Sequence, residues 1–260
     1  MDCSGKVILI TGASSGIGRA TAIALSHYGN SIIITARREE LLASASEEIK
    51  KNGSECLYFA GDALDPSHAD KVVAEIVKKY GHLDIAIMNI GIGPPSNTLT
   101  ASREKILHCM RSDYDTMINF YYPIMQQMKT QATRCMIVHM NSQASFFGVP
   151  MQGDYTAAKS AARIFLETAR MELKHFGINH IAIQTVHPGF VATAAVAGDG
   201  IPTPAQISEE EAARYVLRGL RKEVRENLFP FGMRCATRLG QVAPHWLLTK
   251  ILLSETPKKY

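Results

Sequence analysis

The sequence has few cysteines, and their spacing argues against the two structural roles that cysteine most often plays. There are five in 260 residues: Cys3, Cys56, Cys109, Cys135 and Cys235. No two form a C-x-x-C pair and the total is odd, so neither a disulfide framework nor a zinc site is indicated. We expect no metal, and reduced thiols favour a cytoplasmic location.

Long apolar runs are also absent. No stretch of eighteen apolar residues occurs, so the sequence predicts no membrane-spanning helix. The first residues, MDCSGKVILITG, lack the basic-then-apolar pattern of a signal peptide. With 46% apolar and 20% charged residues, the chain has the composition of a globular protein that can bury a sizeable core.

The excess of positive over negative charge is small over the whole chain but large at its C-terminal end. The formal net charge is +4, and we expect no nucleic-acid partner. Residues 214–260 hold ten Lys or Arg against three Glu. This basic end could contact a membrane surface or an anionic ligand, although a solvated basic face is the simpler interpretation.

Predicted strands and helices alternate along the chain. Strands are expected at 6–10, 31–36, 55–62, 83–91, 134–142 and 179–189, and helices at 18–29, 39–53, 69–81, about 103–129, 154–177 and 209–222. A short edge strand in NLFPF and two helices at 233–242 and 244–253 would follow. The alternation predicts an α/β fold with one doubly wound parallel sheet of the Rossmann type. We expect a single domain over 1–260, with 223–260 as its basic amphipathic extension.

A glycine-rich segment, TGASSGIG, lies at 11–18 between the first strand and the first helix. Gly12 permits a tight turn there, and Gly16 and Gly18 allow close approach of a pyrophosphate and of the sheet. The helix N terminus offers unpaired N–H groups to phosphate. In this context the motif indicates a dinucleotide site rather than a turn without a ligand.

The spacing G-x-x-x-G-x-G resembles the T-G-x-x-x-G-x-G signature of the short-chain dehydrogenases/reductases, over roughly residues 5–220. The second strand ends in TARREE, so Ala36 stands where an NAD site commonly presents a carboxylate. Arg37 and Arg38 suit a 2′-phosphate, which favours NADP(H) over NAD(H). The predicted cofactor-binding residues are Gly12, Ser14, Ser15, Gly16, Ile17, Gly18, Arg37, Arg38, Asp62, Ala63, Asn89, Gly91, Tyr155, Lys159, Pro188, Val191 and Thr193.

Three residues resemble the family's catalytic set. Ser142 ends a predicted strand, and DYTAAK places Tyr155 and Lys159 one helical turn apart. The resemblance implies that Tyr155 exchanges a proton with a carbonyl oxygen that Ser142 holds. Lys159 and a cationic nicotinamide would lower the pKa of Tyr155, and Lys159 would also bind the ribose. The resemblance further implies that the loop after Thr193, up to Glu209, lines the substrate pocket, and its composition predicts a mobile lid.

Two departures from the family pattern concern cofactor and proton transfer. MNIG at 88–91 replaces the usual N-N-A-G but keeps Asn89 and Gly91. Counting back from Ser142 places Asp113 where the family has an Asn that supports a water leading to the lysine. A carboxylate there would add charge near Lys159. It is the only support for the alternative that the chain is a cofactor-binding regulator with weak or no turnover.

The C-terminal stretch resembles reductases that act on lipid-like ketones. We therefore expect an apolar ketone or secondary alcohol as substrate. Apolar residues (Trp246, Leu247, Leu248, Ile251 and Leu252) lie beside basic ones, which fits a core, a subunit contact or a peripheral membrane contact. By resemblance, the helices at 103–129 and 154–177 would form a homodimer or homotetramer.

Overall fold

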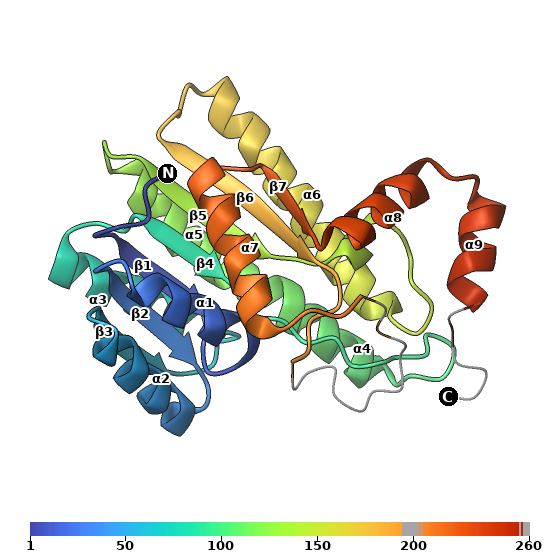
Figure 1. Cartoon of the computed structure of the whole chain (residues 1–260), viewed down its shortest axis with the longest axis horizontal. Helices are drawn as coiled ribbons and strands as arrows, with labels where there is room; N and C mark the ends of the chain where they lie inside the picture. Colours follow the sequence, from blue (N-terminus) through green and yellow to red (C-terminus); the bar gives the residue numbers. More distant parts are fainter. Residues whose placement is uncertain (194–202, 204, 255, 257–260) are drawn as a thin grey trace.

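One sheet organises the molecule, as Figure 1 shows. The structure is a computed structural model that describes residues 1–193, 203, 205–254 and 256. Seven parallel strands pair in the order β3-β2-β1-β4-β5-β6-β7. Their bounds are β1 Val7–Thr11, β2 Ser31–Ala36, β3 Glu55–Ala60, β4 Ile85–Met88, β5 Cys135–Met140, β6 Ile181–Pro188 and β7 Glu226–Phe229. The predicted fold class is confirmed.

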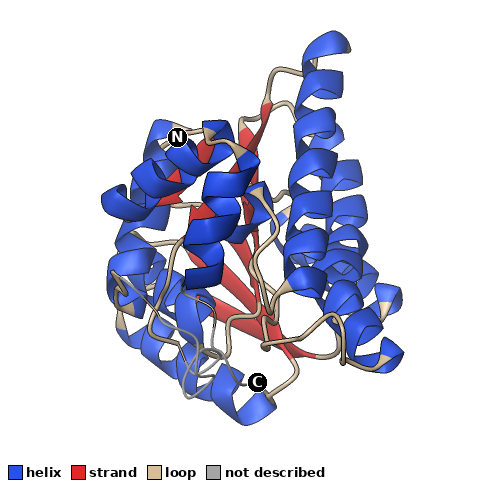
Figure 2. Ribbon diagram, turned by 90° about the vertical axis from the view of Figure 1, so that its right-hand side faces the viewer, coloured by secondary structure: helices blue, strands red, loops and turns tan. Residues whose placement is uncertain are grey.

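Helices cover both faces of the sheet, which Figure 2 shows edge-on between two layers of helices. Buried side chains of α1, α2 and α7 pack on one face, and those of α3, α5 and α6 pack on the other. The bounds are α1 Gly16–Ser26, α2 Glu39–Lys51, α3 Pro66–Tyr80, α4 Arg103–Met110, α5 Thr116–Lys129, α6 Gly153–His175, α7 Glu209–Lys222, α8 Phe231–Val242 and α9 His245–Ser254.

Burial on both faces explains the strand sequences. In β1, Ile8 and Ile10 belong to one apolar layer while Val7 and Leu9 belong to the other. Successive side chains of a strand point to opposite faces, so a strand covered on both sides is apolar at every position. The first strand connection runs from β1 outward to β2, and β4 pairs on the other side of β1. This reversal opens a crevice at the carboxyl ends of the strands.

Most predicted helices are shifted by one to three residues at an end, and two differences have a clear structural cause. The helix expected from residue 69 begins at Pro66, because the Asp65 carboxylate accepts the Ser67 N–H at 2.9 Å and caps the earlier turn. The helix expected over 103–129 is divided into α4 and α5 by a π-helical turn at Arg111–Asp115. In such a turn the side chains point in directions different from those of a continuous α-helix.

Candidate active site

The turn between β1 and α1 is built on backbone that only glycine adopts easily. Gly12 has φ 65° and Gly16 has φ 63°, in the left-handed region where side chains cost energy. α1 begins at Gly16, and the first N–H groups of a helix have no partner within it. The turn therefore combines close backbone approach with unpaired donors, which is the arrangement that an anionic group needs.

Gly18 and Asn89 fasten this turn to the neighbouring strand. The Asn89 side chain donates to the Gly12 carbonyl at 3.2 Å, and its backbone N–H donates to Thr11 Oγ1 at 3.0 Å. A Cβ on Gly18 would lie 2.4 Å from Asn89 Nδ2 and 2.6 Å from the Gly12 oxygen. These two residues hold the glycine turn against the end of β4.

Basic side chains meet the same turn from the end of β2. Arg38 donates from Nη2 to Ser15 Oγ at 2.6 Å and to Ser14 Oγ at 3.0 Å. Arg37 is exposed beside it, and Ala36 ends the strand without a carboxylate. Both arginines line the crevice together with Ser14 and Ser15, so this corner carries positive charge and hydrogen-bond donors.

A single cavity of about 910 Å³ runs along the carboxyl ends of the strands. Of the residues predicted for cofactor binding and catalysis, every one except Gly18 lines it. Those residues are Gly12, Ser14, Ser15, Gly16, Ile17, Arg37, Arg38, Asp62, Ala63, Asn89, Gly91, Ser142, Tyr155, Lys159, Pro188, Val191 and Thr193. The tertiary fold thus brings seven separate chain segments to one cavity.

The acid–base candidates converge in this cavity. Lys159 is 3% exposed, and its ammonium lies 5.7 Å from the centroid of the Tyr155 ring. The same Nζ atom lies 3.0 Å from Asp113 Oδ1 and donates to the Met140 carbonyl at 3.2 Å. The π-helical turn carries Asp113, which is fully buried. The expectation of a carboxylate near Lys159 is confirmed as a direct ion pair.

Burial, rather than Lys159, dominates the ionisation of Tyr155. Desolvation raises the pKa of the phenol, the Lys159 ammonium pulls it down, and the Asp113 carboxylate raises it again. The net pKa of Tyr155 lies above the ordinary value: Lys159 lowers it, as predicted, but burial outweighs that effect. Burial lowers the pKa of Lys159, but Asp113 and Tyr155 outweigh it and leave the ammonium more strongly protonated than usual.

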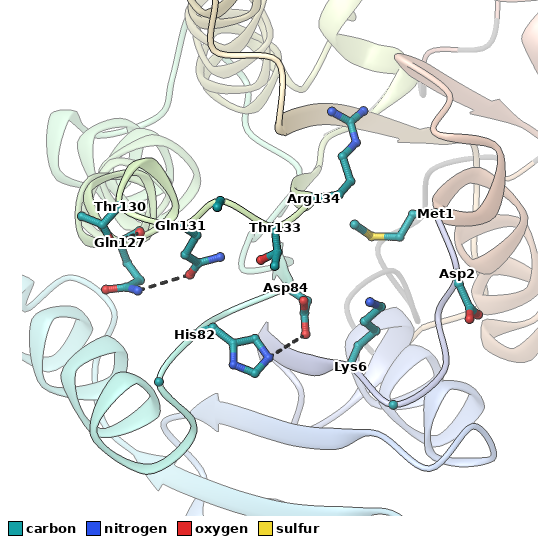
Figure 3. Close-up of a pocket in the computed structure, with 13 residues that line it drawn as sticks. Met1, Asp2, Lys6, His82, Asp84, Gln127, Thr130, Gln131, Thr133 and Arg134 are labelled. Atoms are coloured by element: carbon teal, nitrogen blue, oxygen red, sulfur yellow. Dashed lines mark hydrogen bonds and ion pairs between the residues drawn. The ribbon is translucent and has the colours of Figure 1, made fainter.

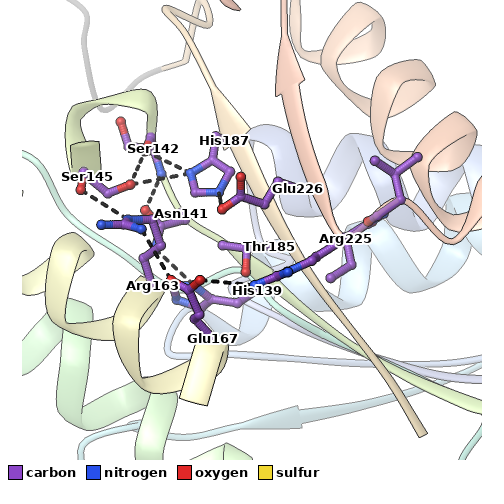
Figure 4. A network of polar contacts seen from close by, with 12 residues as sticks. His139, Asn141, Ser142, Ser145, Arg163, Glu167, Thr185, His187, Arg225 and Glu226 are labelled. Atoms are coloured by element: carbon purple, nitrogen blue, oxygen red, sulfur yellow. Dashed lines mark hydrogen bonds and ion pairs between the residues drawn. The ribbon is translucent and has the colours of Figure 1, made fainter. Parts of the chain in front are cut away.

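A polar network holds Ser142 from behind, as Figure 4 shows. The Ser142 carbonyl accepts from Ser145 Oγ at 2.8 Å and lies 3.1 Å from His187 Nδ1. His187 is fully buried, and its other ring nitrogen lies 4.0 Å from a carboxylate oxygen of Glu226. Desolvation lowers the pKa of His187 to about 4, so the ring is neutral and Nδ1–H is the donor to the carbonyl.

Comparison with known proteins identifies the family. The sequence profile of a family described as short chain dehydrogenase matches residues 6–200. The chain belongs to the short-chain dehydrogenase family. It is an oxidoreductase and an enzyme by that membership.

Individual relatives agree with this assignment. An uncharacterized oxidoreductase of Listeria monocytogenes is 31% identical over 193 residues, 74% of this chain and 77% of that protein. A 3-ketodihydrosphingosine reductase of Bacteroides thetaiotaomicron is 28% identical over 86% of this chain and 79% of that protein. A short-chain dehydrogenase/reductase of Burkholderia phymatum, solved in complex with NAD, has a TM-score of 0.83 at 20% identity, covering 100% and 99% of the two chains. That structural likeness shows a shared fold.

The segment after β6 closes this short-chain dehydrogenase cavity near the glycine turn. Thr193 Cγ2 would lie 3.6 Å from a Cβ placed on Gly16. Val191 is buried and pairs with Ile207 through a parallel bridge. The predicted substrate-pocket loop falls mainly on residues 194–202 and 204, which lie outside the described residues.

The C-terminal helices form the apolar wall of the cavity, a role that the sequence did not reveal. Leu247, Leu248, Ile251 and Leu252 of α9 line it, as do Met233, Ala236, Leu239 and Gly240 of α8 and Phe147 of the segment after β5. The wall is anchored behind Ser142, since Thr237 bonds to the Gln143 side chain, which donates to the Phe229 carbonyl at 2.8 Å. The apolar spacing of 246–252 was the only available signal, and it fitted several alternatives equally well.

A second, shallower hollow lies at the amino ends of the strands, far from this chemistry (Figure 3). His82 Nε2 lies 3.2 Å from Asp84 Oδ2 there, and Gln127 bonds Gln131 at 3.2 Å. The Gln131 side chain also accepts the Leu83 N–H at 3.0 Å and donates to the Leu83 carbonyl at 3.1 Å, which joins the two segments at this end of the sheet. Among the residues that the structure describes, no helix is long and apolar enough to cross a membrane.

Proposed function

We propose that this enzyme uses NADP(H) to exchange a hydride between nicotinamide and a ketone or secondary alcohol. The observation that carries the proposal is the meeting of Ser142, Tyr155 and Lys159 in the cavity that the glycine turn also lines. A nicotinamide cofactor fits this cavity, because left-handed glycines, α1 donors and two arginines gather at one end. When bound, the cofactor supplies or accepts the hydride.

The proposed roles follow from the chemistry of each side chain. Tyr155 gives its hydroxyl proton to the carbonyl oxygen during reduction and takes it back during oxidation. Ser142 holds the same oxygen through its hydroxyl, whose oxygen accepts the Ala144 N–H at 3.1 Å. Lys159 keeps a positive charge near the phenol and binds ribose hydroxyls.

The proposed substrate is apolar. The cavity surface beyond Ser142 is formed by leucine, isoleucine and methionine side chains of α8 and α9, and the relative from Bacteroides thetaiotaomicron is named for a lipid ketone. We expect kcat/KM for methyl ketones, from 2-butanone to 2-decanone, to rise about fourfold per added methylene until the apolar wall is filled. NADPH absorbance measures the rate. The absence of NADPH consumption with the whole series would refute the proposed function.

The preference for NADP(H) is proposed from Arg37 and Arg38. We expect Arg37→Ala and Arg38→Ala each to raise KM for NADPH by about 10- to 100-fold, because each removes a charged donor to the 2′-phosphate. KM for NADH should change less than threefold. Arg19→Ala is the matched control, since Arg19 is a nearby guanidinium paired with Glu48 at 2.6 Å and absent from the cavity wall. Equal effects on both cofactors would contradict the assignment.

We also propose a homodimer or homotetramer built on α5 and α6. Tyr122, Ile164 and Met171 are large apolar residues more than half exposed on these helices, and such side chains cluster at subunit contacts. Light scattering that finds only monomer would remove this proposal.

The outer face of α8 and α9 supports a proposed peripheral membrane contact. Val242 and Trp246 are 81% and 69% exposed, and Lys250 lies on the same helix pair. Apolar residues flanked by basic ones suit an anionic lipid surface. If the protein does not co-sediment with phosphatidylserine vesicles, a subunit contact becomes the better explanation.

We also propose a cytoplasmic location, because all five cysteines are free thiols.

The regulator alternative loses its support if turnover is measured. It predicts that NADPH binds while wild type and Tyr155→Phe are equally inert toward the ketone series. Binding by fluorescence and turnover by absorbance therefore separate the two functions.

A further inference from the structure

A buried carboxylate shares the ammonium on which the proposed acid–base chemistry depends. Asp113 Oδ1 lies 3.0 Å from Lys159 Nζ, and both side chains are almost fully removed from solvent. Gly91 makes room for the contact, since a Cβ there would lie 2.5 Å from Asp113 Oδ1 and 2.6 Å from Lys159 Nζ. The ion pair therefore depends on a glycine at position 91, since any side chain there would collide with both of its charged groups.

The partners of Asp113 show which protonation state it holds. Oδ1 accepts the Ile92 backbone N–H at 3.1 Å as well as the lysine, and the Cys109 thiol donates to Oδ2 at 3.6 Å. All three partners are donors, which is the set that an acceptor-only carboxylate requires. Burial and Asp113 raise the pKa of Cys109 to about 12, so that thiol keeps its proton. Burial raises the pKa of Asp113, and these donors act against that rise and favour Asp113 as the anion of a buried ion pair.

Each element packed around Tyr155 contributes polar or titratable groups near its hydroxyl. On α6, Lys159 favours the phenolate, and Asp154 bonds the Tyr155 backbone N–H at 2.9 Å. From β5 and its end come Ser142, which also favours the phenolate, and His139, whose pKa burial pushes well below the ordinary value and which stays neutral.

The elements before β5 act in the opposite direction. Asp113 on the π-helical turn and Cys109 on α4 both disfavour the phenolate, and His108 of α4 is exposed at the cavity wall. A lysine alone would present a full positive charge to the phenol. A lysine paired at 3.0 Å with a carboxylate acts on the phenol less strongly, because the carboxylate offsets part of its charge.

We propose that Asp113 is a positioning residue that balances the charge of Lys159 and so keeps the Tyr155 hydroxyl protonated through neutral and mildly alkaline pH. The inference rests on the proposed function, because it concerns the same tyrosine. Proton donation to a ketone then persists to higher pH, and proton removal from an alcohol begins at higher pH. The π-helical turn is the structural means, because it carries Asp113 to Lys159 of α6.

The test is Asp113→Asn, which keeps the shape and the acceptor for Ile92 N–H but removes the charge. We measure pH profiles of kcat/KM for 2-decanone with NADPH and for 2-decanol with NADP⁺. Both midpoints are expected to move to lower pH by about one pH unit, since one nearby unit charge has been removed. Asp115→Asn is the matched control, because Asp115 lies on the same turn but is exposed. It should leave both midpoints in place.

Unchanged or higher midpoints in an active Asp113→Asn variant would overturn the proposal. A second measurement covers a variant that does not fold. Phenolate absorbance of wild type minus Tyr155→Phe gives the titration of Tyr155 itself, and the proposal requires its midpoint to lie above the ordinary value of about 10. A midpoint below that value overturns the proposal.

This titration also separates the inference from the proposed function. It needs no turnover, so a wild-type protein that reduces no ketone would defeat the proposed function while Tyr155 still reports on Asp113. Conversely, ketone reduction with a low Tyr155 midpoint would leave the function standing and remove the role of Asp113.

Discussion

Tyr155→Phe is expected to lower kcat by about 10²- to 10⁴-fold, because it removes the group proposed to exchange a proton with the substrate oxygen. The substitution deletes one hydroxyl and keeps the ring, which packs against Gly93 and lies 5.7 Å from the Lys159 ammonium. Cofactor affinity and unfolding midpoint should therefore stay close to wild type. Rates of NADPH consumption with 2-decanone, with NADPH binding followed by fluorescence, measure the two effects separately.

Tyr121→Phe is the control for this change. Tyr121 is half-buried on α5 and does not line the cavity. Its ring packs edge-on against Phe165, with 5.0 Å between the ring centroids. Loss of its hydroxyl should alter kcat less than twofold. A Tyr155→Phe enzyme that keeps a third or more of wild-type kcat would show that another group carries the proton.

Lys159→Met is expected to abolish measurable turnover and also to destabilise the fold by about 3–5 kcal/mol at neutral pH, because it leaves the Asp113 carboxylate buried without its counter-ion. Asp113 is 0% exposed, so water cannot replace the lost partner. Urea unfolding followed by circular dichroism measures the stability, and NADPH absorbance measures the activity.

The loss of stability should depend on pH with a defined sign. Burial raises the pKa of Asp113 above the ordinary value even with Lys159 beside it, and removal of the ammonium raises it further. The folded variant then retains a proton that the unfolded chain releases near pH 4. Because the folded state binds more protons in this window, stability decreases as pH rises from about 4 through the folded-state pKa. The variant should be closest to wild type in stability at pH 4 to 5.

A double variant separates stability from catalysis. Lys159→Met combined with Asp113→Asn removes both charges, so most of the lost stability should return, whereas turnover should not. If the double variant is as unstable as Lys159→Met alone, the damage comes from the packing of the methionine and not from an unpaired carboxylate.

The sequence alone determined the fold and the chemistry of the parts. β1 and β2 are apolar at nearly every position because helices cover both faces of the sheet, and that pattern is local to each strand. The glycine turn at 11–18 could be located because Gly12 and Gly16 adopt a backbone that other residues resist. Helix boundaries were less certain, and α3 began at Pro66 because the cap on Asp65 extends the helix beyond its apolar positions.

Only the tertiary structure decided how these parts act on one another. The pairing of Asp113 with Lys159, the net pKa of Tyr155 and the apolar wall of α8 and α9 all depend on side chains from separate segments meeting at one place. A residue's periodicity records which face of its own helix is buried, but not which charge or cavity lies opposite. The balance between desolvation and a neighbouring charge is set by distances across the fold, and those distances exist only once the chain has packed.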